Sequence, residues 1–451
     1  MSALVRRHAR WVVPVATPPI PNGTVVTDGE RITWVGPRAN APVGGQDEEL
    51  GDCILTPGLV NAHTHLDLTM MRGALEDLTF FEWVRTLTRA KRELLTDDDF
   101  RAAALLGAAE GLSRGITTFG DTSDNDAAFD ALLTLGARGI AYREVFGADP
   151  AQVDASIAGL TTAIATMRLR ATPLVRLGVS PHAPYSVSDA LFVSVREFAD
   201  REGLPLAVHI AESAAEDDLV IRASGPFAEF LRARGLEVER RASGPIQLID
   251  AAGLLRQNTL LIHCVRVAAS DVARIADTGC GIAHCPTSNA KLGHGVAPLR
   301  EFLATGARVG LGSDSMASNN TMDLLAEARL AVLQQRAITK TPDALPARAA
   351  FRLATLGGAE ALRLDDEIGS LVPGKQADLA AFRVSDLGLP AEDPLAALVF
   401  GAGQVVAHRV IIAGRERVRD GVVTDLDPGV PARVRAAALR LTQWRSARAA
   451  L

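Results

Sequence analysis

Two histidines one residue apart, His63 and His65, follow the apolar run Ile54–Val60, which Pro57 and Gly58 interrupt. Alternate residues of a strand share a face, so both imidazoles can point the same way from the end of one strand. Neutral imidazoles that converge in this way suit a borderline metal ion such as zinc. Two polar side chains at a strand end would look the same, and the pair alone does not decide between these interpretations.

Further residues of this kind occur where other strands are predicted to end. His209 follows Leu206–Val208, His263 follows Leu260–Ile262, and Asp314 comes just after Val309–Gly312. Glu212 lies three residues beyond His209. A lone buried histidine is usually a core residue with satisfied hydrogen bonds, but a set of histidines and carboxylates at strand ends predicts one shared site.

Eight short β-like runs alternate with longer helical patterns between about residues 63 and 314. The predicted strands are Leu59–His65, Ile116–Gly120, Gly139–Val145, Leu174–Ser180, Leu206–Ile210, Leu260–Cys264, Gly281–Cys285 and Val309–Gly312. The predicted helices include Asp97–Arg114, Ala151–Arg170, Ser188–Glu202, Ser270–Thr278, Leu324–Arg336 and Ala347–Leu362. Eight successive βα units favour an α/β fold, a (β/α)8 TIM-like barrel. A doubly wound sheet is the alternative, but the chain has no Gly-x-Gly-x-x-Gly turn.

Both chain ends contain strand-like runs instead of βα units. Val12–Val15 and Asn22–Gly36 read as strands joined by Asn-Gly and Asp-Gly turns, and Ala377–Phe382 and Val410–Arg415 are strand-like late in the chain. We therefore predict a small β-sandwich domain formed from both chain ends. The predicted boundaries are 1–56 and 366–430 for the small domain, 57–365 for the barrel and 431–451 for a C-terminal surface helix.

Composition excludes several classes of protein. The 451 residues are 48% hydrophobic, which is ample for a large core and a smaller second domain. The net charge of -6 and the absence of a basic tract argue against a nucleic-acid partner. The sequence has no apolar run of membrane-spanning length, no signal peptide and no paired spacing among its four cysteines. These features predict a cytoplasmic protein without a membrane or nucleic-acid partner.

The ordered set of motifs resembles the amidohydrolase superfamily, and within it the branch of aromatic deaminases and chlorohydrolases. The resemblance covers nearly the whole chain. Its motifs are Thr56–Leu66, Gly115–Thr118, Ser180–Tyr185, His209–Ser213, Ile262–Val265, His284–Gly293, Gly312–Ser315 and Gly369–Asp378.

The resemblance implies that His63, His65, His209 and Asp314 bind one divalent metal ion. Two-metal members of the superfamily carry a bridging carboxylated lysine on the fourth strand, and the corresponding run, Leu174–Ser180, contains no lysine. A mononuclear site is therefore expected. Zinc is favoured, and iron occurs in relatives, because this set of ligands does not separate the two metals.

The same resemblance implies the catalytic roles. A bound metal lowers the pKa of its water from about 15.7 toward ~7. Asp314 would accept the water proton, His263 would orient the water, and Glu212 would carry a proton to the ring nitrogen beside the attacked carbon.

Four residues are candidates for substrate binding. Glu82, in the loop-like stretch Phe80–Trp83, resembles a glutamate that binds ribose hydroxyls in S-adenosylhomocysteine and methylthioadenosine deaminases. The alternative is an acidic residue in the first turn of a surface helix. His182 and Ser318 match substrate contacts of that group. Arg143 would bind a distal substrate carboxylate, or it would pair with Glu144.

The resulting hypothesis is a hydrolytic deaminase of a 5'-modified adenosine: S-adenosylhomocysteine, methylthioadenosine or aminodeoxyfutalosine. The alternative is an amino- or chlorohydrolase of an s-triazine or another N-heterocycle, like a guanine or cytosine deaminase. A non-catalytic barrel would be expected to lose metal ligands, and every one is present here. In each catalytic case the partner is a small-molecule substrate, and the resemblance suggests a homo-oligomer.

Overall fold

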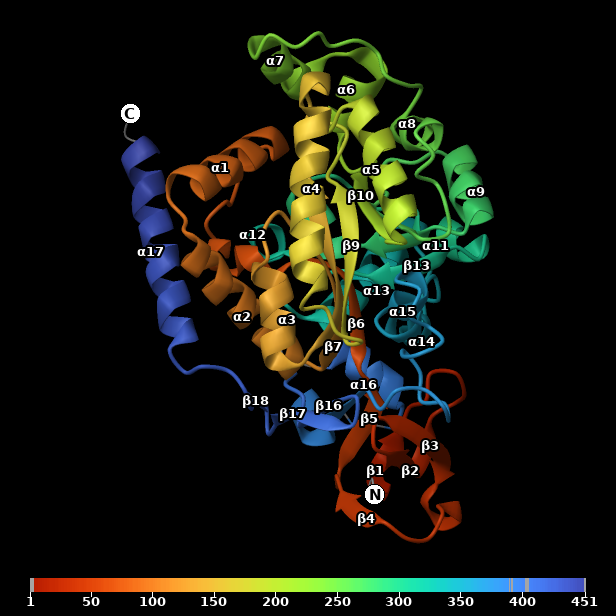
Figure 1. Cartoon of the computed structure of the whole chain (residues 1–451). Coiled ribbons are helices and arrows are strands. Elements are labelled where there is room, and N and C mark those ends of the chain that lie inside the picture. Colours follow the sequence, from red (N-terminus) through yellow and green to blue (C-terminus); the bar gives the residue numbers. More distant parts are fainter. Residues whose placement is uncertain (1–3, 389, 391, 402–404, 450–451) are drawn as a thin grey trace.

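A barrel of parallel strands forms the main body of the computed structural model (Figure 1), which describes residues 4–388, 390, 392–401 and 405–449. Its strands are β6 (Leu59–His65), β7 (Ile116–Ser123), β8 (Arg138–Val145), β9 (Val175–Pro181), β10 (Leu206–Ile210), β11 (Thr259–His263), β12 (Gly281–His284), β13 (Arg308–Leu311) and β14 (Asp314–Ser315). Neighbouring strands pair in parallel from β6 round to β13. Each predicted barrel strand is present, with ends that shift by at most a few residues.

Two short strands close the barrel together. β13 pairs with β12, and β14, which follows after only two residues, pairs with β6. The break between them falls at Gly312, where an added Cβ would lie 3.0 Å from the Cβ of His63. Glycine therefore lets the eighth strand approach β6 closely enough to bring Asp314 beside the two histidines.

Helices cover the outside of the barrel and its upper rim. They are α1 (Phe80–Glu93), α2 (Asp97–Ser113), α3 (Ala127–Leu135), α4 (Val153–Arg168), α5 (Asp189–Glu202), α6 (Ala214–Arg222), α7 (Gly225–Ala233), α8 (Pro245–Ala251), α9 (Ala269–Thr278), α10 (Pro286–Lys291), α11 (Leu299–Ala304), α12 (Met316–Asn319), α13 (Leu324–Thr339), α14 (Ala347–Leu353) and α15 (Leu356–Ala361). The predicted helix Ala347–Leu362 is split into α14 and α15, because the backbone of Thr355 leaves the helical region. Capping boxes at Thr79 and Thr96 begin α1 and α2.

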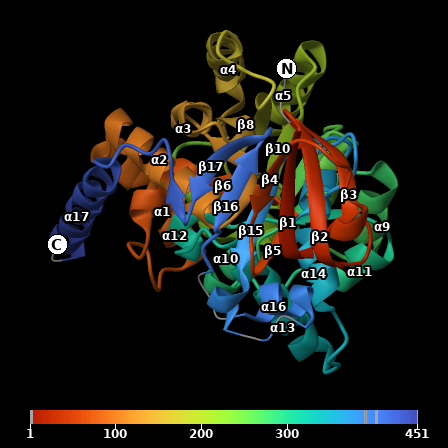
Figure 2. The same cartoon turned by 90° about the horizontal axis from the view of Figure 1, so that it is seen from below.

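Both chain ends build one nine-stranded sheet below the barrel, as Figure 2 shows from beneath. Its strands are β1 (Leu4–Val12), β2 (Ile20–Asp28), β3 (Arg31–Pro37), β4 (Gln46–Glu49), β5 (Cys53–Pro57), β15 (Leu379–Arg383), β16 (Arg409–Ile412), β17 (Arg415–Arg419) and β18 (Val422–Val423). β5 pairs with β15, and a bridge between Arg31 and Gln376 joins the far edge of the sheet to the segment before β15. The sheet thus encloses its own small apolar core, and the predicted extra domain from both chain ends is confirmed.

One of the two predicted turns in this domain is wrong. Asp28 and Gly29 do form the β2–β3 hairpin, where Asp28 pairs with Arg31. Asn22 and Gly23 instead lie inside β2, where Asn22 takes a left-handed conformation and an added Cβ on Gly23 would meet Val12 at 2.7 Å. The dipeptide therefore makes a local irregularity within a strand, not a chain reversal.

A buried ion pair ties the barrel to the small domain. Arg138, which begins β8, donates to Asp378 through Nε at 2.6 Å and Nη2 at 3.1 Å. The predicted C-terminal helix is α17 (Val430–Ala449), which packs along α2, and the last two predicted residues lie outside the described ones. The remaining helix, α16 (Pro394–Phe400), packs against α13 and α14. The exact domain boundaries stay predictions.

None of the helices in the described ranges has the length and apolar character that a membrane span needs. The four cysteines are all buried and free.

Candidate metal centre and active site

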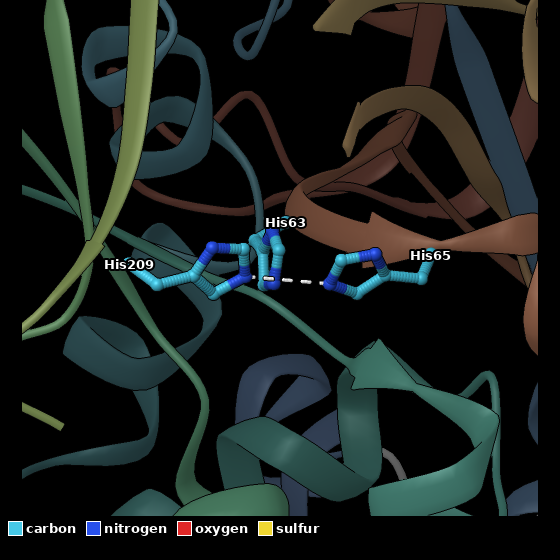
Figure 3. Close-up of side chains that lie close together, drawn as sticks. All are labelled: His63, His65 and His209. Atoms are coloured by element: carbon cyan, nitrogen blue, oxygen red, sulfur yellow. Dashed lines mark hydrogen bonds between the residues drawn. The ribbon is translucent and has the colours of Figure 1, made fainter. Parts of the chain in front are cut away.

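Three imidazoles and a carboxylate converge inside the top of the barrel. His63 and His65 come from β6, and His209 faces them from β10 (Figure 3). The Nε2 atoms of His65 and His209 are 3.3 Å apart, and Asp314 Oδ1 lies 3.2 Å from His63 Nε2 and 3.7 Å from His65 Nε2. The structure thus brings together the four side chains that the sequence predicts as metal ligands.

The donor set fits a metal ion. His209 Nδ1 lies 3.1 Å from the carbonyl oxygen of His182, so Nδ1 carries the proton and Nε2 presents its lone pair toward His65. Burial lowers the pKa of His63 to about 4, and burial likewise lowers the pKa of His65 and of His209. Neutral imidazoles are the form that binds metal, and ligand atoms of His63, His65 and His209 all lie within 4.8 Å of one another.

Left-handed backbone at the strand ends turns these side chains inward. Asp314, His263 and Ala211 have φ angles of 56°, 77° and 51°. Such values are uncommon for residues other than glycine and cluster at active sites, although they also occur in turns. At Asp314 the conformation is held from β6, because Asn61 exchanges two hydrogen bonds with Ser313 at 2.8 and 3.0 Å.

Hydroxyl groups complete the surroundings of Asp314. Its Oδ2 accepts hydrogen bonds from Ser288 at 2.6 Å and from Ser318 at 3.1 Å. Burial would raise the pKa of Asp314, but the contact with His63 and the nearby imidazoles hold it well below its usual range. Asp314 is therefore anionic. Ser318, a predicted substrate contact, lies on this carboxylate at the metal cluster.

Glu212 lies at the edge of the cluster, directly after β10. Its Oε1 is 3.5 Å from His263 Nε2 and 3.2 Å from His294 Nε2, and the residue is only 3% exposed. Burial would raise the pKa of Glu212, but His263 and His294 face the carboxylate and hold the pKa below its usual value. The predicted pair of Glu212 and His263 is thus in contact, with the carboxylate ready to accept a proton.

His182 also lies next to the cluster. Its ring centroid is 4.8 Å from that of His209, and its Nδ1 lies 2.7 Å from Ser186 Oγ. Burial lowers the pKa of His182 to about 3, so the ring is neutral.

Two predicted substrate contacts have other partners in the structure. Arg143 binds Asp126 at 2.9 Å, so the alternative that it pairs with Glu144 is wrong. The stretch Phe80–Trp83 is the first turn of α1 and not a loop, and Glu82 is exposed and completes the capping box of that helix with Thr79. Neither side chain is brought to the metal cluster.

Comparison with known proteins agrees with this geometry. Residues 54–417 match the model of the amidohydrolase family. The chain belongs to that family. The cluster at the top of this amidohydrolase is accordingly a His/Asp metal site.

Curated relatives match almost the full length. A 5-methylthioadenosine/S-adenosylhomocysteine deaminase of Moorella thermoacetica is 32% identical over 92% of this chain and 94% of its own. A protein of the same name from Nitratidesulfovibrio vulgaris strain Miyazaki F is 34% identical over 91% of this chain and 92% of its own.

Solved structures show the same fold. An adenosine deaminase from Xanthomonas campestris with bound zinc is 28% identical and superposes with a TM-score of 0.87 over 97% of this chain and 98% of its own. An aminofutalosine deaminase from Helicobacter pylori reaches 0.79 at 21% identity, over 92% of this chain and all of its own, a likeness of fold alone.

Three supporting residues of this amidohydrolase were not predicted from its sequence. Glu216 accepts hydrogen bonds from the backbone N–H groups of Ala211 and Glu212 at 2.8 and 2.9 Å, Asn289 holds His263, and Ser288 holds Asp314. The Ser-x-x-Glu spacing from Ser213 to Glu216 is a helix-start signal that could have drawn attention to Glu216. Ser288 and Asn289 lie within the motif His284–Gly293, which indicates their importance but not which side chains they contact.

Proposed function

We propose that this chain is a metal-dependent deaminase that hydrolyses the amino group from the adenine ring of a 5'-modified adenosine and releases ammonia. The observation that carries the proposal is a buried carboxylate, Glu212, in contact with His263 beside the His/Asp cluster. Relatives that are 32–34% identical over nine-tenths of the chain carry the name of such a deaminase. The substrate class is therefore S-adenosylhomocysteine, methylthioadenosine or a related nucleoside such as aminodeoxyfutalosine.

We propose His63, His65, His209 and Asp314 as the ligands of a single divalent ion, with zinc favoured over iron. The converging lone pairs and the anionic carboxylate support this set. The related Xanthomonas deaminase has bound zinc. When bound, the ion supplies water of lowered pKa, near ~7, as the nucleophile.

The residues of the chain would then divide the proton transfers. Asp314 and Glu212 are anionic and can take the proton that the attacking water loses. Glu212 can deliver it to the ring nitrogen next to the attacked carbon, which lets the aromatic system accept the electron pair. His263, at the end of the neighbouring strand β11, would orient the water. The hydroxyl group now on the attacked carbon would lose its proton to Asp314 or Glu212, which would pass it to the amino group. The C–N bond then breaks, ammonia leaves, and the ring keeps a carbonyl oxygen.

Substrate contacts remain predictions. Ser318 and His182 lie at the cluster and fit a role in holding the purine ring. Glu82 would bind ribose hydroxyls only if it gives up part of its contact with Thr79, and Arg143 would bind a distal carboxylate only by releasing Asp126. A homo-oligomeric state and a cytoplasmic location also remain predictions.

An ultraviolet assay of zinc-loaded protein tests the proposal. The panel holds adenosine, methylthioadenosine, S-adenosylhomocysteine, aminodeoxyfutalosine, guanine, cytosine and a chloro-s-triazine, with Glu212→Gln as the control. We expect an adenine-to-hypoxanthine change with release of ammonia. Loss of the carboxylate should lower the rate by ~10²–10⁴, the usual contribution of acid–base catalysis. Silence on every adenosine with turnover of the triazine or another base would contradict the proposal.

A further inference from the structure

His294 is a second histidine that faces the carboxylate of Glu212. Its Nε2 lies 3.2 Å from Glu212 Oε1, and both side chains are 4% exposed. His294 Nε2 makes no hydrogen bond of good geometry among the described residues, so a small rotation would give it the carboxylate as a partner. The contact is short and buried, and it joins an imidazole nitrogen that can donate a hydrogen bond to a carboxylate oxygen that can accept one.

The two histidines on Glu212 are not equivalent. His263 Nδ1 lies 2.9 Å from Asn289 Oδ1, and with the Asn289 amide placed this way its oxygen can only accept. When His263 is neutral, its proton lies on Nδ1 and the lone pair of Nε2 faces Glu212, so His263 attracts this carboxylate only when its ring is protonated. His294 is then the histidine that can donate an N–H to this carboxylate while neutral.

The loop around His294 fixes where its ring lies. Its backbone N–H donates to the carbonyl oxygen of Asn289 at 2.9 Å, so one residue anchors both histidines. Gly293 and Gly295 on either side have φ angles of 72° and 106°, values that glycine adopts without strain. The ring of Phe80 meets the imidazole edge to face, with centroids 4.6 Å apart.

We propose that His294 is a positioning residue for Glu212, holding the carboxylate at the angle from which it exchanges a proton with the substrate ring. The inference rests on the proposed function and adds one residue to it. A carboxylate held by one N–H donor keeps its direction, and a shift of about 1 Å in such a group can cost on the order of 10²-fold in rate. His294 acts on the reaction through Glu212 and not by contact with the metal ligands.

The test compares His294→Ala and His294→Gln with the zinc-loaded wild-type chain on methylthioadenosine and S-adenosylhomocysteine. We expect His294→Ala to lower kcat by about 10- to 100-fold with KM within about threefold, because only the proton transfer is disturbed. His294→Gln, which keeps an N–H donor, should recover at least a third of the wild-type kcat. His408→Gln in the small domain is the control, and metal content is measured for every variant.

Four outcomes would overturn the inference. These are an unchanged kcat in His294→Ala, a raised KM at constant kcat, equal loss in both variants, or a loss explained by missing zinc. If His294→Ala does not fold, Phe80→Leu replaces it. This variant loosens the same ring, and we expect a two- to fivefold loss of kcat; no loss overturns the inference. If the wild type acts only on the triazine, the proposed function fails, and the same comparison on that substrate still decides the role of His294.

Discussion

The two faces of the active site are built differently. The metal face consists of His63, His65, His209 and Asp314, which lie on or directly after strands of one sheet. The face that would meet the substrate draws on the first turn of α1, through Glu82. Side chains on paired strands take their positions from the register of the sheet, whereas those on helix ends and loops depend on local partners. The metal face should therefore respond sharply to single substitutions and the substrate face weakly.

Loss of a metal ligand should have the largest effect. We expect His209→Ala to retain less than about a tenth of an equivalent of zinc and to lose more than ~10²-fold in kcat/KM, since even outer partners of ligands are worth 10–100-fold. Metal analysis and the nucleoside assay measure both. His408→Ala serves as the control. Full metal content in His209→Ala would remove this histidine from the proposed ligand set.

Loss of the Ser288 hydroxyl group, which donates to Asp314, should have the next largest effect. Ser288→Ala removes the 2.6 Å hydrogen bond to Oδ2, and we expect zinc affinity to fall about 10- to 100-fold. A competition titration with a chelator measures the affinity, with the exposed Ser385→Ala as the matched control. Unchanged affinity would show that Ser318 and the backbone of β14 are enough to hold the carboxylate in place.

At Glu82, a role in substrate binding can be separated from the role in capping helix α1. Thr79→Ala breaks the same capping box but keeps the carboxylate, at a cost of ~1 kcal/mol in stability. If Glu82 binds ribose, Glu82→Gln should raise KM for adenosine about three- to tenfold, because a charged acceptor is lost, while Thr79→Ala should not. Steady-state kinetics and thermal melts give both quantities. Equal KM values for the two variants would leave Glu82 as a capping residue only.

The smallest effect is expected at Arg143. Its partly exposed pair with Asp126 is worth ~0–1 kcal/mol, so Arg143→Met should change the ratio of kcat/KM for S-adenosylhomocysteine over methylthioadenosine by less than about twofold. A fall of more than tenfold in kcat/KM for S-adenosylhomocysteine alone would contradict this prediction and indicate that Arg143 binds the substrate carboxylate.

The barrel was accessible to prediction because its strands combine apolar runs with polar residues at their ends. All eight predicted strands occur, and His263 and Asp314 lie at the ends where the sequence indicated. The wrong predictions occur where one short sequence pattern is compatible with two different local structures. Asn22 and Gly23 suit a hairpin turn and an irregular strand equally well. Glu82 suits a ribose contact and a helix start, and the threonine three residues before it favours the second.

The sequence by itself determined the barrel, the extra domain from both chain ends and the identity of the residues that meet at the metal site. The barrel and the positions of these residues at strand ends depend on periodicity and on residue type, which are local properties of the chain. The choice of the four metal ligands among them came from the family resemblance. Only the tertiary structure decided that Asn289 holds His263, that Asp126 takes Arg143 and that His294 faces Glu212. Each of these contacts joins segments that barrel closure and loop packing bring together. The spacing of residues along the chain therefore does not predict the contact.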